Sequence, residues 1–297
     1  MQIDSAINVS LIDTFSDFLK FWEKVTHLDL DQQIEAWEMD CMGNRSELLQ
    51  LQIADYASQG EDWRQVGAKK IFPFVESRLV EMQAAHDILL AEFEPICRKA
   101  QAKLGFNQNL AGLIHVGIGC GAGWVTLYAG KQTILFGLEN IAECHWSNGP
   151  SLKGLIAHEI GHVVQAAWRS EAGLKDYEES WWQLFIEGFA QQCEHLILGL
   201  ESWHMASSSD GDWLAWCQQN RGYLANRFLE DTSQGNDISP FFGSWHTIRG
   251  HSQCGYFLGH EAIQDILTSG MTFREILLLE NPEHHIVEAV KHLALVG

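Results

Sequence analysis

The chain has few basic residues for its size. Its 297 residues include 19 Lys and Arg against 39 Asp and Glu, which gives a formal net charge of −20 at pH 7. A charge of this sign is repelled by a nucleic-acid backbone and by an anionic membrane, so we expect neither as a partner. With 46% hydrophobic residues and only 5 prolines, the chain is nevertheless able to bury a large core, in one domain or two.

The sequence also lacks the marks of export and of disulfide chemistry. The amino terminus, Met1 to Ser10, has no basic residue followed by a long apolar run, so we expect no secretory signal. No stretch offers the ~18 uncharged residues that a membrane-spanning helix needs. The 7 cysteines are odd in number, scattered and free of any CxxC pair. These absences favour reduced thiols in a cytoplasm and argue against a structural zinc site built from cysteines.

Hydrophobic spacing predicts a helical amino-terminal region, residues 1–108. Apolar residues recur at steps of three and four from Leu11 to Val25 and again from Val75 to Phe93. After Gly105 the pattern changes, and short β-favouring runs near 114–118, 124–128 and 133–138 are separated by glycine-bearing turns. We expect a small antiparallel sheet here.

The glycines of residues 117–123 belong to this predicted sheet. A phosphate-binding loop must open a helix, but a strand-like run follows these glycines. We therefore expect them to form a hairpin connection rather than a nucleotide site.

Helical signals return after Pro150. Ser151 is a candidate cap for a helix through about Trp168, and Ser180 for another through about Leu198. The order of helices, sheet and helices lacks the βαβ alternation of a parallel fold, so the predicted class is α+β and mainly helical. We place a second domain at residues 109–297, with a single domain as the alternative.

The segment His158-Glu159-Ile160-Gly161-His162 carries the predicted chemistry. Two histidines four residues apart lie on one helix face, where both imidazoles reach a single Zn²⁺. Glu159 is turned by about 100° from His158, so its carboxylate reaches metal-bound water rather than the metal, as a general base does. Gly161 permits the close approach of another element. The alternative is a solvated His and Glu on an ordinary helix.

A catalytic zinc site needs a third protein ligand and keeps its fourth position for water. Glu187 is a candidate because it lies in a strongly apolar stretch, residues 180–190, where a carboxylate needs a compensating charge. A metal ion supplies that charge. Gly188 and Ala190 beside it suit tight packing of the two helices. The alternative is that Glu187 lies on the exposed face of an amphipathic helix.

These residues resemble a known family. HExxH followed by a glutamate within the run WWQLFIEGFA is similar to the gluzincin metallopeptidases, especially the aminopeptidase N group, whose third-ligand segment has the form WLNEGFA. The resemblance implies a thermolysin-like two-helix site that holds one zinc ion. Its ligands would be His158, His162 and Glu187, with Glu159 as the base.

The resemblance also implies an oxyanion donor. In the aminopeptidase N group a tyrosine of a YxKG segment has this role, and Tyr256 of Tyr256-Phe257-Leu258-Gly259 matches it. The alternative for Tyr256 is a buried structural tyrosine. His260, close to it in the sequence, is a further candidate for contacting the oxyanion or the substrate.

Other features depart from the family pattern. Gly137-Leu138-Glu139-Asn140 matches the exopeptidase segment GxMEN only in part. If the match is real, this run is an edge strand that pairs with the substrate and Glu139 binds its free amino terminus; otherwise Glu139 caps a strand end. Leu258 replaces the lysine of YxKG, and the connection near residues 170–179 is longer than usual. The chain therefore resembles a distant gluzincin.

The sequence as a whole predicts a zinc-dependent peptidase, a hydrolase that cleaves peptide or protein substrates with a metal-activated water. Ligation by two histidines and a glutamate suits zinc best, though not uniquely. Two other classes are alternatives. One is a catalytically silent, zinc-containing binding or regulatory protein of peptidase-like fold, and the other is a metal-independent helical interaction protein.

Overall fold

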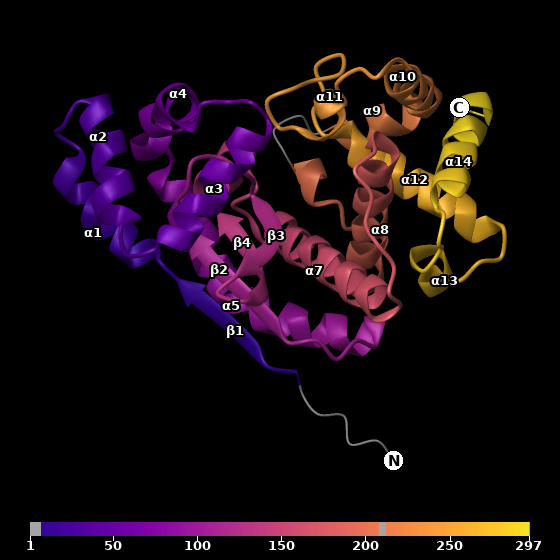
Figure 1. Ribbon diagram of the computed structural model, residues 1–297, viewed down its shortest axis with the longest axis horizontal. Helices are drawn as coiled ribbons and strands as arrows, with labels where there is room; N and C mark the ends of the chain where they lie inside the picture. The colour runs from indigo at the N-terminus through magenta and orange to yellow at the C-terminus, as the bar shows by residue number, and fades with distance from the viewer. Residues whose placement is uncertain (1–6, 208–211, 297) are drawn as a thin grey trace. The chain divides into compact units, whose positions relative to one another are not determined.

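The computed structural model describes residues 7–207 and 212–296 (Figure 1). Residues 1–6 lie outside this range. The expectation of no secretory signal rests in part on these residues. The chain divides into two compact units: residues up to Arg98 with Asn109–Ile156, and Lys99–Gln108 with the residues from Ala157 onward. In this division residues 109–156 belong with the amino-terminal residues, whereas the sequence analysis placed them in the second predicted domain. The predicted domain boundary after residue 108 stays a prediction.

The first unit contains a four-stranded sheet in the order β1-β2-β4-β3. β1 pairs with β2 and β2 pairs with β4 in parallel, and only β3 and β4 are antiparallel. The α+β, mainly helical class is therefore confirmed, but the prediction of an antiparallel sheet is wrong. The strands are β1 (Val9–Asp13), β2 (Leu110–His115), β3 (Gly123–Tyr128) and β4 (Lys131–Gly137).

The sheet contains both parallel and antiparallel pairs because the chain after β2 does not turn back to form a neighbouring strand. Residues 116–122 do not form the expected hairpin, because β2 and β3 are not neighbours in the sheet. The hairpin lies one strand later, between β3 and β4, where Ala129 and Gly130 have φ values of 50° and 70°. Two successive residues with positive φ are typical of a tight hairpin turn. Leu11, expected in a helix, belongs to β1, which adds a parallel strand at the sheet edge.

The helices of the first unit follow the predicted apolar spacing. α1 buries Phe15, Phe18, Trp22 and Val25 among its core residues. The run from Val75 forms a single long helix that continues into the second unit. The helical elements are α1 (Phe15–Val25), α2 (Leu30–Ala36), the π-helix η1 (Trp37–Cys41), α3 (Ser46–Ser58), α4 (Trp63–Val66), the π-helix η2 (Gly67–Ile71), the 3-10 helix η3 (Phe72–Phe74), α5 (Val75–Leu104) and α6 (Leu138–Glu143).

Two long helices, α7 (Gly149–Glu171) and α8 (Ser180–Leu198), agree closely with the helices predicted after Pro150. α7 begins earlier than expected, since the side chain of Asn148 accepts a hydrogen bond from the Ser151 amide at 3.0 Å. Residues 172–179 form the long connection between them. The part of α7 from Ala157 onward and all of α8 belong to the second unit.

Glycines bring the helices of the second unit close together. A Cβ atom on Gly161 of α7 would lie 2.9 Å from Cα of Ala190, which confirms the expected close approach. A Cβ atom on Gly188 would lie 2.3 Å from the carbonyl carbon of Gly259, so Gly188 packs against α12 rather than α7. The remaining elements are η4 (His204–Ser207), α9 (Trp213–Gln219), α10 (Arg221–Gln234), α11 (Ser239–Phe242), α12 (Cys254–Thr268), α13 (Phe273–Leu277) and α14 (Glu283–Val296).

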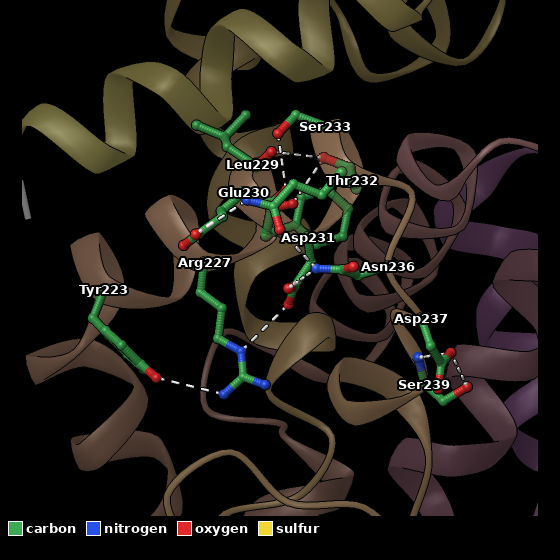
Figure 2. Close-up of polar contacts among 12 residues, drawn as sticks. Tyr223, Arg227, Leu229, Glu230, Asp231, Thr232, Ser233, Asn236, Asp237 and Ser239 are labelled. Atoms are coloured by element: carbon green, nitrogen blue, oxygen red, sulfur yellow. Dashed lines mark hydrogen bonds and ion pairs between the residues drawn. The ribbon is translucent and has the colours of Figure 1, made fainter.

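Figure 2 shows the polar contacts that end α10 and begin α11. Gly235 takes the left-handed conformation, with φ 67°, that ends many helices. The Asn236 side chain then donates to Asp231 at 3.1 Å, and Asp237 accepts from the Ser239 amide at 2.9 Å. These contacts stabilise the turn between α10 and α11. Among the described residues, no helix has both the length and the apolar character that crossing a bilayer requires.

Candidate metal centre

The three predicted metal ligands meet in the second unit. α7 carries His158 and His162 one turn apart, and α8 carries Glu187. Oε2 of Glu187 lies 3.1 Å from Nε2 of His158 and 3.3 Å from Nε2 of His162. Ligand atoms bound tetrahedrally to zinc at ~2.0–2.2 Å are about 3.3–3.6 Å apart, so these separations are close to those around one ion.

The charges of this ligand set are complementary. Burial lowers the pKa of His158 to about 4, so its imidazole is neutral at pH 7, which is the form that binds a metal. Burial also acts to lower the pKa of His162, but the Glu187 carboxylate raises it to about 9. Although burial acts to raise the pKa of Glu187, the charge on His162 and the hydrogen bond with His158 hold it well below its usual value. Glu187 is thus a carboxylate that needs a cation.

Glu159 lies beside the ligand set on the same helix. Its side chain is buried, and burial raises its pKa to about 7 against the opposing effect of His162. A carboxyl group with a pKa near neutrality can both accept a proton and return it. This property is the one expected of the predicted general base.

Tyr256 also lies close to the ligands. It occupies the first turn of α12, and its ring centroid is 5.5 Å from that of His158. The close packing of α12 against α8 through Gly259 and Gly188 brings it there. The role of Tyr256 as an oxyanion donor stays a prediction.

Glu139 belongs to the first unit and does not lie on an edge strand. It follows β4 at the start of α6, and β4 lies between β2 and β3, so the expectation of an edge strand here is wrong. The side chain is fully buried, and its Oε1 accepts a hydrogen bond from the Gly119 amide at 3.0 Å. This hydrogen bond joins Glu139 to the loop between β2 and β3. A role for Glu139 in substrate binding stays a prediction, and it requires that the buried carboxylate become accessible.

His260 contacts a different group of residues. Its Nε2 lies 3.1 Å from Nδ1 of His195, and its Nδ1 lies 3.1 Å from Oε1 of Glu261. The rings of both histidines pack against Trp203, each with a centroid distance of 4.8 Å. Within the described ranges, its hydrogen bonds join none of the predicted metal ligands. A role for His260 in substrate binding stays a prediction.

The structure adds a second histidine–glutamate set that the sequence analysis missed. One potential ligand atom from each of His158, Glu194 and His204 lies within 4.8 Å of the other two. Glu194 follows Glu187 by seven residues, which places both on one face of α8, and this spacing was a usable signal. His204 lies beyond the end of α8, where no periodicity indicates its position.

Distances distinguish the two sets. Oε2 of Glu194 and Nδ1 of His204 are 2.7 Å apart, which is a direct hydrogen bond and too short for two ligands of one tetrahedral zinc ion. Oε1 of Glu194 also accepts hydrogen bonds from the Ser202 hydroxyl at 2.7 Å and from the His204 amide at 3.0 Å. Donors therefore already surround this carboxylate. The set of His158, His162 and Glu187 is the better candidate metal centre.

No protein-family model, curated protein or solved structure matches this chain. The resemblance to gluzincins therefore rests on the motif residues of the sequence and stays a prediction.

Proposed function

We propose that this protein is a zinc-dependent peptidase of the gluzincin type that hydrolyses peptide or protein substrates. The observation that carries the proposal is the meeting of His158, His162 and Glu187 at separations close to those around one metal ion. Glu159, buried beside them with a pKa raised to about 7, supports it. Two imidazoles and one carboxylate are a ligand set typical of catalytic zinc.

In the proposed mechanism, His158, His162 and Glu187 would hold the zinc ion, which would polarise a carbonyl group and lower the pKa of water. Glu159 takes a proton from the attacking water on its carboxylate and returns it to the leaving amine. Tyr256, next to His158, donates a hydrogen bond to the developing oxyanion.

A cytoplasmic location is part of the proposal. All seven cysteines of the chain are free, which agrees with a reducing compartment.

The Glu159→Gln variant tests the proposed base. Gln has nearly the shape of Glu but cannot take the proton, so we expect hydrolysis of a peptide library to fall by about 10²–10⁴-fold while bound zinc is unchanged. Glu178→Gln, at an exposed position before α8, is the matched control and should retain full activity. Undiminished turnover by Glu159→Gln would refute the assignment of the base. Zinc binding without any hydrolysis by the wild-type protein would indicate a binding or regulatory protein instead.

A further inference from the structure

His158 lies between two carboxylates of α8. Glu187 and Glu194 lie on the same face of α8, two helical turns apart. This spacing separates their Cα atoms by about 10 Å along the helix axis. His158 nevertheless belongs to both histidine–glutamate sets. Its Nε2 faces Glu187 at 3.1 Å. The side chain of His158 is therefore close to both carboxylates.

The second nitrogen of His158 needs an acceptor. Among the described residues, Nδ1 of His158 is buried and makes no hydrogen bond. Coordination of a metal through Nε2 requires the proton of the neutral imidazole to be on Nδ1. Metal-binding histidines almost always donate this proton to a carboxylate, a carbonyl group or water. Glu194 is the carboxylate that the second set places near His158.

Glu194 is held in a single orientation. It is fully buried and accepts hydrogen bonds from the Ser202 hydroxyl, the His204 amide and Nδ1 of His204 at distances of 2.7, 3.0 and 2.7 Å. Gln191, also on α8, donates to the Ser202 carbonyl oxygen at 3.1 Å and so fixes the same segment. The His204 ring packs against that of His158, with centroids 4.8 Å apart and planes at 65°. This geometry is an imidazole–carboxylate–imidazole arrangement.

We propose that Glu194 is a positioning residue for the metal ligand His158. It accepts the Nδ1 proton when Nε2 binds the metal, and it thereby sets the tautomer and the ring orientation of this ligand. His204 and Ser202 hold the Glu194 carboxylate for this role. The inference rests on the proposed metal centre and adds residues that contact neither the metal nor the substrate.

The Glu194→Gln variant tests this inference, because the amide keeps the size of Glu and an acceptor oxygen but loses the charge. We expect zinc affinity, measured by competition with a chelator, to fall about 10–100-fold. The absorption spectrum of the Co²⁺-substituted protein should also shift, since the orientation of a ligand changes. Glu201→Gln, exposed just before Ser202, is the matched control and should change neither.

Several outcomes would overturn the inference. Unchanged zinc affinity and an unchanged Co²⁺ spectrum in a folded Glu194→Gln protein would refute it while leaving the proposed peptidase intact. Two zinc ions per wild-type chain, with one lost in Glu194→Gln, would show that the second set is itself a metal site. Failure of the wild-type protein to bind zinc would refute both this inference and the proposed function.

A measurement on the unmutated protein covers the case in which Glu194→Gln does not fold. In the zinc-loaded wild-type chain labelled with ¹⁵N-histidine, NMR should show that His158 carries its proton on Nδ1. A proton on Nε2 of His158, with Nδ1 as the metal ligand, would overturn the inference.

Discussion

The two compact units both bury carboxylates but surround them differently. In the first unit, Glu139 accepts a hydrogen bond from a backbone amide, and burial raises its pKa to about 6. In the second unit, Glu187 and Glu194 face imidazoles at 3.1 and 2.7 Å, and despite burial these rings hold both pKa values below the usual one. Burial alone therefore does not identify a reactive carboxylate. Its partners do, because an imidazole can bind a metal or a proton, whereas a backbone amide can only donate a hydrogen bond.

The largest effect is expected for Glu187→Gln. Loss of a direct ligand should reduce zinc affinity by more than the tenfold to hundredfold expected for a positioning residue. Elemental analysis after dialysis, together with the gain in melting temperature on adding Zn²⁺, measures this loss. Glu139→Gln, the buried carboxylate of the other unit, is the control and should bind zinc normally. Equal zinc loss in both variants would contradict the contrast between the two environments.

Tyr256→Phe should come next in size. Loss of one oxyanion donor is expected to lower kcat by about 10²–10³-fold with bound zinc unchanged. Tyr223→Phe is the control, since the Tyr223 hydroxyl lies 3.5 Å from Arg227 in the α10 cluster of Figure 2. A rise in KM without a fall in kcat would assign Tyr256 to substrate binding instead of the transition state.

Stability should also differ between glycines of the two units. The methyl group of Gly188→Ala would meet the backbone of Gly259 at 2.3 Å, so we expect a loss of about 1–3 kcal/mol in the free energy of unfolding. In Gly117→Ala the nearest atoms to the methyl group are all in side chains: Oε1 of Gln52 at 2.2 Å, Cε1 of His115 at 2.8 Å and Oε1 of Glu139 at 3.0 Å. A shift of Gln52 breaks its hydrogen bond with the Ile118 amide, at a cost of about 1 kcal/mol. Urea denaturation measures both. A larger loss for Gly117→Ala would reverse the expected order.

An effect similar in size to those of the glycine variants is expected in the pH dependence of stability through Glu139. Its pKa in the folded protein, about 6, exceeds its ordinary value of 4.5, so the folded state holds more protons between these two pH values. The contribution of Glu139 to the free energy of unfolding therefore falls as pH rises from 4.5 to 6, by about 1–2 kcal/mol, and is constant above. Glu139→Gln should lack this decrease. Parallel curves of melting temperature against pH for the two proteins would contradict the prediction.

The local pattern of the chain determined the two helices of the candidate site. α8 spans the predicted residues 180–198, and α7 extends beyond the predicted helix at both ends. The four-residue spacing of His158 and His162 determined that they share a face, because helix geometry alone sets that relation. The apolar surroundings of Glu187 indicated that its carboxylate needs a cation. Together with the histidine spacing, this predicted that His158, His162 and Glu187 meet.

Only the tertiary structure decided which elements became neighbours. β-propensity identified β3 and β4, but the strand order and the parallel pairing of β1 with β2 depend on contacts between residues far apart in the chain. His204 could not be predicted from the sequence for the same reason. Its position beside Glu194 depends on the path of the chain after α8. Local sequence sets the direction in which a side chain leaves its element, whereas long-range packing decides what that side chain meets.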